Sequence, residues 1–350
     1  DPSYVERERA SRKLAALGVD ARPALMEALQ ADDEEVRYRA RGLLLKILDD
    51  DLNSRIARFT ADINGDAEAN LPGWRAYRDL VGDSLDNRRL FVEIIRSEPL
   101  LMEALESSPQ EATEALRIRA NSLQQEMQQP QFFDNQHVPH RVALGTVAAF
   151  FLAAADEDVA VDENIGRIVQ SILYQSSFQV DINSGARAEP LRRMLGRWIV
   201  RNRSTTMAYQ GLHFAMQYNL QEGRELAIHL IQAGGQPANL LQTALLVLGR
   251  FGDANDLKTV EPLLNDASPV QFGANQENFQ QEVRDIALAV AIHLSGQELR
   301  EYGFSNAQPN PQMLYNPGTL TFTSPAMRDA AFGKWEAWRA KQSAATPGKS

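Results

Sequence analysis

The segment ERASRKLAALGVDARPALMEALQADDEEVRYRARGLLLKI (residues 8–47) predicts three short helices in succession. In its first part Ala10, Leu14 and Leu17 recur at intervals of four and three residues, which places them on one helix face. Gly18 follows directly, and glycine readily ends a helix because it adopts a left-handed backbone at no steric cost. The spacing and the stop together indicate an amphipathic helix that packs through one face.

Two further helices are expected in the same segment. Asp20 is positioned to cap the second helix, and Pro23 lies in its first turn, where a missing N–H is tolerated. Asp32 is positioned to cap the third helix, with Glu35 three residues later in the arrangement of a capping box. The apolar residues of the third helix form one stripe, made of Val36, Ala40, Leu43, Leu44 and Ile47.

The same order of helix, turn and helix returns late in the chain. The stretch ALLVLGRFGDANDLKTVEPLLND (residues 244–266) contains two helical patterns separated by a Gly-Asp turn, and a third pattern begins at Val283. One helix pair cannot bury its own apolar stripe, so such units stack on their neighbours. The sequence therefore predicts an all-α chain organised as a helical-repeat array, an α-solenoid.

Both segments resemble HEAT repeats. Residues 17–40 follow the bacterial HEAT-like cadence LG-x-x-A-x-P-A-L-x-x-A-L-x-x-D-D-x-E-V-R-x-R-A, and residues 244–266 are similar to a second copy. The stretches VRDIALAVAIHLSGQELREYGF and AAFGKWEAWRAK, near the C-terminus, resemble a family of exported bacterial HEAT-repeat proteins. The resemblance is weak over residues 50–235. It implies a helical interaction surface without chemistry, and export to the periplasm or the cell exterior.

The remainder of the chain is expected to be helical but irregular. Nine further helical patterns lie between residues 74 and 233, and the polar stretch 125–136 is the best candidate for a hinge. A proline-containing surface loop with a short extended piece at residues 319–323 precedes a last helix capped by Ser324. The expected parts are an N-terminal HEAT-like repeat (1–50), an irregular helical region (51–129), a central helical region (130–236), a C-terminal HEAT-like repeat (237–302), and a loop with a capping helix and mobile tail (303–350).

The composition excludes several classes of protein. The 350 residues include no cysteine, which removes disulfides, thiol nucleophiles and cysteine-ligated metal sites. Lys and Arg number 36 against 46 Asp and Glu, and the net charge of −10 argues against a nucleic-acid coat or a binder of anionic membranes. The longest apolar run, at residues 142–155, is shorter than the roughly 18 residues that a membrane span needs.

Several short motifs resemble functional sites, but each lacks part of the pattern. His137 and His140 have an HxxH spacing without the glutamate of a zinc helix. Asp62, Asn64 and Asp66 match the first oxygen ligands of a calcium loop, whereas its glycine and its closing carboxylate are missing. The acidic run DEDVAVDE and the terminal PGKS depart further from their patterns. We therefore expect no catalytic residue, no cofactor and no metal ligand, and leave open only calcium at the first acidic turn.

The strongest charge feature is an arginine stripe on one predicted helix. Residues 187–203 contain six arginines and one glutamate, a local charge of +5 in a chain of net charge −10. Arginines four residues apart are neighbours on a helix and repel each other, so an opposite charge is expected to face them. Two sources are open: an acidic neighbouring helix of this chain, or an anionic partner bound through Arg192, Arg193, Arg197, Arg201 and Arg203.

A non-catalytic protein-binding or scaffold protein is the expected function, with another protein as the partner. Two alternatives stay open: a module that binds a polyanion through the arginine stripe, and an enzyme whose site lies within residues 50–235. Nucleic acid is the least expected polyanion. The resemblance implies export, with a cytoplasmic location as the alternative, and the first residue, Asp1, leaves open whether a leader peptide was removed.

Overall fold

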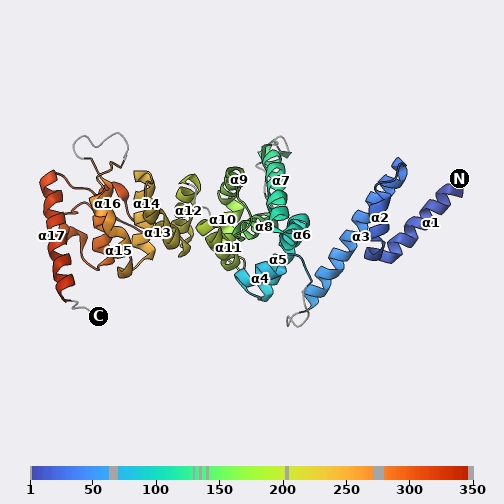
Figure 1. Cartoon of the computed structure of the whole chain (residues 1–350), viewed down its shortest axis with the longest axis horizontal. Helices are drawn as coiled ribbons and strands as arrows, with labels where there is room; N and C mark the ends of the chain where they lie inside the picture. The colour runs from blue at the N-terminus through green and yellow to red at the C-terminus, as the bar shows by residue number, and fades with distance from the viewer. Residues whose placement is uncertain are drawn as a thin grey trace.

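A computed structural model describes residues 2–62, 70–128, 131–133, 136–138, 142–201, 205–270 and 280–345. Most of these residues are helical, and the strands among them form two short antiparallel pairs. The prediction of an all-α chain is confirmed. Figure 1 shows the helices following one another along the long axis broadly in sequence order, with the first and the last helix at opposite ends.

The elements are joined mostly by short turns. The N-terminal part contains α1 (Pro2–Leu17), the 3-10 turn η1 (Gly18–Ala21), α2 (Arg22–Ala28) and α3 (Glu34–Ala61). The middle contains α4 (Trp74–Val81), α5 (Leu85–Ser97), α6 (Pro99–Ser107), α7 (Pro109–Gln128), β1 (Gln131–Phe133), β2 (Gln136–Val138), α8 (Leu144–Ala155), α9 (Glu163–Leu173), α10 (Ser176–Asn183), α11 (Ala188–Arg201), α12 (Thr205–Tyr218) and α13 (Glu222–Ala233). The C-terminal part contains α14 (Ala238–Phe251), η2 (Ala254–Asp256), α15 (Leu257–Val260), η3 (Glu261–Asn265), α16 (Val283–Leu294), η4 (Leu299–Tyr302), β3 (Pro309–Asn310), β4 (Leu314–Tyr315), η5 (Pro317–Thr319) and α17 (Pro325–Ala345).

The first helices form a small unit, here called the N-terminal arm, which consists of α1, η1, α2 and α3 as far as Leu48. Gly18 ends α1 with a φ of +58°, as the sequence predicted. The predicted stripe of α3 is confirmed in part, because Val36 is exposed. The buried core of the arm is limited to Ala21, Leu25, Ala40, Leu44 and Ile47.

Two predicted helix caps are wrong. The side chain of Asp33, rather than that of Asp32, accepts the backbone N–H of Glu35 at 2.8 Å and so caps α3. Asp20 lies inside the 3-10 turn that continues from α1, and the residue before α2 is Ala21, which makes no side-chain cap. In both places the turn extends one residue further than the helix-start pattern indicates.

Helix α3 runs without interruption through residue 50, where the sequence had suggested a boundary. Its packing partners nevertheless change there. Ile47 belongs to the core of the arm, whereas Ile56 and Phe59 belong to the large core that runs through the rest of the chain. We call the part of the chain from Leu52 onward the main body. The second half of α3 is therefore the physical link between the arm and the main body.

The link is strengthened by one arginine of α5. The guanidinium of Arg88 lies 5.0 Å from the ring centroid of Phe59 and 5.6 Å from that of Trp74. Its Nη1 donates a hydrogen bond at 2.6 Å to the backbone carbonyl of Asp62, just after the end of α3. Cation–π contacts and a charged donor to a helix C-terminus both stabilise this junction.

Close packing holds α5, α7 and α8 together in the main body. At Gly145 of α8 a Cβ atom would lie only 2.2 Å from the carbonyl oxygen of Glu93 in α5, so the two backbones meet directly. The buried carboxylate of Glu98 accepts the Thr146 hydroxyl at 2.8 Å and Arg119 Nε at 2.8 Å. The turn before α6 is thereby tied to both α7 and α8.

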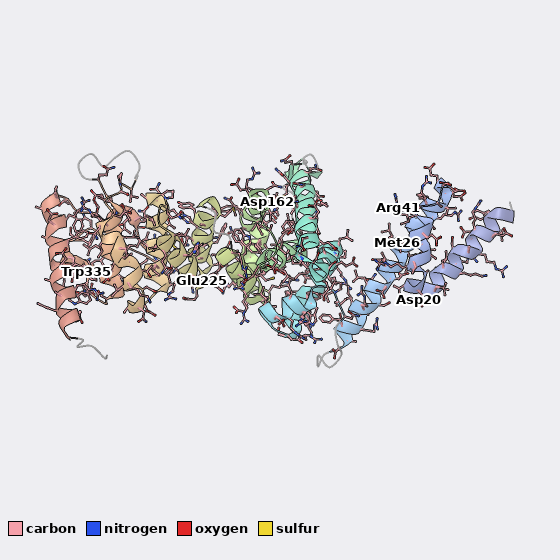
Figure 2. All side chains as sticks on the ribbon, in the orientation of Figure 1. Asp20, Met26, Arg41, Asp162, Glu225 and Trp335 are labelled. Carbon is pink, nitrogen blue, oxygen red and sulfur yellow. The ribbon has the colours of Figure 1, made fainter. Side chains whose placement is uncertain are left out.

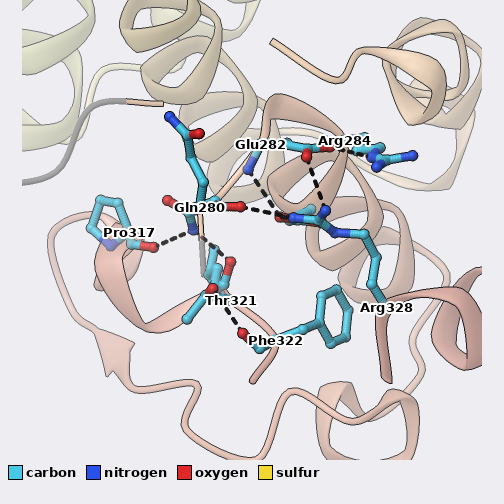
Figure 3. A network of polar contacts seen from close by, with 10 residues as sticks. Gln280, Glu282, Arg284, Pro317, Thr321, Phe322 and Arg328 are labelled. Carbon is cyan, nitrogen blue, oxygen red and sulfur yellow. Dashed lines mark hydrogen bonds and ion pairs between the residues drawn. The ribbon is translucent and has the colours of Figure 1, made fainter. Parts of the chain in front are cut away.

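A buried ion-pair network, shown in Figure 3, fastens the last helix to α16. Arg328 of α17 donates from Nε and Nη2 to the two carboxylate oxygens of Asp285, at 2.8 and 2.7 Å. It also donates from Nη1 to Glu282 at 2.9 Å and from Nη2 to the Gln280 carbonyl at 2.9 Å. Asp285 is fully buried, so this network is shielded from solvent.

The C-terminal loop and the predicted hinge differ in part from expectation. The hydroxyl of Ser324 accepts the backbone N–H of Met327 at 3.3 Å, which confirms the cap of the last helix. The extended piece predicted at residues 319–323 is wrong, since the strands of this loop are β3 and β4. The hinge prediction for residues 125–136 overlaps the end of α7 and the β1–β2 pair, and α10 was not expected from the sequence.

Candidate interaction surfaces

The predicted arginine stripe lies on α11, and acidic side chains of this chain face it. Arg193 pairs with Glu189 at 2.8 Å one turn earlier on the same helix. Arg197 pairs at 2.9 Å with Glu157, which lies in the acidic loop between α8 and α9. Arg201 is the second partner of Glu157. The in-chain source of negative charge, one of the two that the sequence left open, is therefore present.

The flanking arginines are also engaged. Arg192 donates from Nε to the carbonyl of Ile182 at 3.0 Å. Arg187 pairs with Glu93 of α5 and lies 3.7 Å from Asp181. Arg203 lies outside the described residues. Apart from the hydrogen bond of Arg192, the described part of the stripe is thus a set of ion pairs between largely exposed side chains, each of which contributes little to stability.

The other motifs singled out in the sequence do not assemble into a site. Asp62 lies 3.7 Å from Arg88, whereas Asn64 and Asp66 lie outside the described residues, as do His140 and the side chain of His137. Asp162, in the second acidic run, caps α9 by accepting the backbone N–H of Ile165 at 2.9 Å. Among the residues that the structure describes, no group of three or more His, Asp or Glu side chains is arranged to hold a metal ion.

Two histidines are partly buried among aromatic neighbours. The ring of His213 packs edge-on against Tyr209, with ring centroids 4.8 Å apart, and Nδ1 of His293 lies 3.4 Å from the hydroxyl of Tyr315. Burial lowers the pKa of both imidazoles below the ordinary value of 6.5, because the charged form loses solvation. Both rings are therefore expected to be neutral at neutral pH and to act as packed side chains.

No helix within the described ranges has both the length and the apolar character that crossing a lipid bilayer requires.

Exposed apolar side chains concentrate on the N-terminal arm. In the part of the chain that the structure describes, 15 large hydrophobic side chains are exposed, and eight of them lie within the arm. Single exposed apolar residues are normal on a protein surface, whereas exposed apolar residues that share one face mark an interaction surface. Figure 2 labels one of these residues, Met26, and also Arg41, on the arm. The eight residues are Tyr4, Val5, Leu17, Val19, Met26, Val36, Tyr38 and Leu45.

Helix α3 carries a second apolar stripe that the sequence reasoning missed. Tyr38, Leu45, Leu52 and Phe59 recur every seven residues, which places them on one helix face. We call these four residues the α3 seam. Leu52 and Phe59 pack on the main body, whereas Tyr38 is 79% exposed and Leu45 is 63% exposed. The seven-residue spacing is visible in the sequence, and it could have been used to predict the seam.

Arg41 lies between Tyr38 and Leu45 on the uncovered half of the α3 seam, and two further exposed charges, Glu34 and Asp49, lie one turn beyond its ends. Arg37 donates to the carbonyls of Ala31 and Asp32, and Arg39 pairs with Glu8 and Glu35, so these two arginines are engaged. Arg41 is exposed and makes no side-chain hydrogen bond or ion pair with any other described residue. The uncovered half of the seam therefore combines two apolar side chains with one unpaired guanidinium.

No family model, no curated protein and no solved structure matches this chain. The HEAT-like character of residues 17–40 and 244–266 therefore rests on their sequence pattern, and the function is argued from the surfaces of the chain itself.

Proposed function

We propose that the chain is a non-catalytic protein-binding scaffold, built as a HEAT-like array of stacked helices. The cadence of the two HEAT-like segments supports this, as does the order of the helices along the long axis (Figure 1). In such an array each helix pair buries its apolar stripe against its neighbours, and the flanks of the stack are left to bind partners. The partner is another protein.

The apolar exposure of the N-terminal arm is the observation that carries this proposal. At the opposite end of the chain the apolar surface is covered. Trp335 of α17 is only 3% exposed, and Arg328 of the same helix is hydrogen-bonded to Asp285 of α16. The arm instead presents Tyr38 and Leu45 to solvent. Removing apolar surface from water yields about 25 cal/mol per Å², so a protein that covers this region gains binding energy there.

The arginine stripe gives the polyanion alternative less support. An anionic ligand that used Arg197 and Arg201 would have to displace Glu157, and one that used Arg187 would have to displace Glu93. The exchange of one carboxylate for another anion gains little. The enzyme alternative and export from the cell stay predictions from the sequence.

Site-specific photo-crosslinking in the native cells tests the proposal. We expect a benzophenone side chain placed at Tyr38 or Leu45 to form an adduct with one defined protein, because these side chains lie at the uncovered surface. The matched controls are Ile118 and Val180, which are 61% and 65% exposed on the main body. They are expected to give no adduct, or only a diffuse background.

The pattern across positions decides the outcome. Equal adduct yields at the arm and at the control positions, or no adduct at either, would contradict the proposal that the arm is a binding surface. The products are identified by mass spectrometry of the crosslinked peptides, which also reports the segment of the partner that touches the arm.

A further inference from the structure

We propose that the uncovered half of the α3 seam binds one amphipathic helix of another protein, with a carboxylate of that helix paired to Arg41. This inference rests on the proposed function, and it adds the shape and the charge of the partner. The surface consists of Tyr38, Arg41, Gly42 and Leu45 on the exposed side of α3.

Continuity with an existing interface is the first argument. The same face of α3 is already covered further along the helix, where the ring of Phe59 lies 4.8 Å from Trp74 and 5.9 Å from Phe91. These aromatic partners come from α4 and α5, so helical elements cover that half of the seam. The covered face then continues N-terminally as Leu45 and Tyr38, which meet solvent. A partner helix on Leu45 and Tyr38 would continue the helix packing that α4 and α5 already make on this face of α3.

The spacing of the seam favours a helix as the occupant. Apolar residues that recur every seven positions face a single neighbouring helix over several turns, as in a coiled coil. Helix α3 from Glu34 to Leu48 offers about 22 Å of length at 1.5 Å per residue. At Gly42 a Cβ atom would meet nothing within 4 Å, so the backbone is open to close approach between the two uncovered seam residues. An extended strand would not match this seven-residue repeat.

The charges disfavour a second copy of this chain as the occupant. An antiparallel pair of α3 helices that sets Tyr38 opposite Leu45 also sets Glu34 level with Asp49 and brings the two copies of Arg41 together at the symmetry axis. A parallel pair stacks Arg41 on Arg41 as well. Like charges at facing positions are destabilising, and such pairs set partner choice in helical interfaces. The partner is therefore a different protein.

Arg41 sets the charge that the partner brings. It is exposed beside the seam and is not engaged by any other described side chain, in contrast to Arg37 and Arg39 on the same helix. A guanidinium at the edge of an apolar contact is best satisfied by a carboxylate, which accepts two parallel hydrogen bonds. The partner helix accordingly carries Asp or Glu beside its apolar stripe.

Binding of two synthetic peptides tests the inference. Each is a 21-residue helix with Leu at every a and d position; one carries Glu and the other Lys at every e and g position, so that neither pairs with itself. We expect the full chain to prefer the Glu peptide by roughly fivefold in fluorescence anisotropy, the effect of one exposed ion pair. Arg41→Glu reverses this preference, and Leu45→Ala weakens binding about tenfold, as expected when an interface anchor is truncated. Ile118→Ala on the main body leaves both affinities unchanged.

Each other result counts against the inference. The proposal of a helical partner is wrong if neither peptide binds. It is also wrong if the Arg41→Glu variant still prefers the Glu peptide over the Lys peptide. If sedimentation shows a dimer that Leu45→Ala dissolves, the occupant is a second copy. Adducts at Tyr38 or Leu45 in the native cells, without peptide binding, would support the protein-binding function and contradict only the proposal that the partner is a helix. Absence of adducts would contradict both proposals.

Discussion

Arg328→Ala lowers the free energy of unfolding by about 3–5 kcal/mol, because it leaves the carboxylate of Asp285 buried without its cation. Asp285 is fully buried, and once the guanidinium is removed the backbone N–H of Glu282, at 2.9 Å, is the one donor that the described residues leave to its carboxylate. The loss is measured by urea denaturation. Hydrogen exchange of the α17 amides should accelerate in parallel, because the helix loses its anchor to α16.

A lysine on the same helix supplies the matched control. Lys334 pairs with Glu301 at 3.3 Å, but the two side chains are 46% and 66% exposed. Exposed pairs of this kind contribute about 0–1 kcal/mol, so Lys334→Ala should lower the free energy of unfolding much less than Arg328→Ala does. Equal effects of Arg328→Ala and Lys334→Ala would show that burial of the network does not determine how the C-terminal helix is held.

Gly145→Ala lowers the free energy of unfolding by about 3 kcal/mol, the upper end of what overpacking a core produces. The new methyl group would lie 2.2 Å from the carbonyl oxygen of Glu93 and 2.3 Å from Oγ of Ser97. A backbone carbonyl inside α5 cannot move aside in the way a flexible side chain can, so α5 and α8 must separate. Thermal or urea unfolding measures the change.

The same substitution at another helical glycine should have the opposite sign. Around Gly42 of α3 a Cβ atom meets nothing within 4 Å, and alanine is preferred over glycine in a helix by roughly 0.5–1 kcal/mol. Gly42→Ala is therefore expected to stabilise the chain slightly. A stabilising Gly145→Ala would contradict the close packing of α5 against α8.

Local sequence signals predicted much of the fold. Gly18 and Ser324 mark real helix ends because the φ of +58° and the hydroxyl cap are properties of those residues. The cap predicted at Asp32 is wrong because the adjacent Asp33 offers the same carboxylate one residue later, and the cap predicted at Asp20 is wrong because the 3-10 turn continues through it. The sequence predicts the end of α3 near residue 50, because polar residues there interrupt the apolar pattern. The helix instead continues to Ala61, with Leu52 and Phe59 packed on the main body.

The candidate site was less accessible to sequence reasoning. The partners of the arginine stripe lie far away in the chain, since Glu157 precedes Arg197 by 40 residues and Glu93 precedes Arg187 by 94. No local pattern reveals such a contact. The same holds for the α3 seam, because Leu45 and Leu52 have the same spacing in the sequence. The structure shows that Leu52 packs on the main body, whereas Leu45 is exposed and available to a partner.

The double variant Tyr38→Ala with Leu45→Ala tests the central claim most directly, namely that the uncovered half of α3 binds a partner and does not hold the fold. Its free energy of unfolding and its yield of partner adduct are measured side by side, with the benzophenone placed at Asp49, which is exposed and lies four residues after Leu45 on the same face of α3. We predict a free energy of unfolding within about 0.5 kcal/mol of that of the unmodified chain, as is usual for surface substitutions, together with loss of the adduct. A retained adduct, or a loss of stability of several kcal/mol, would contradict the account.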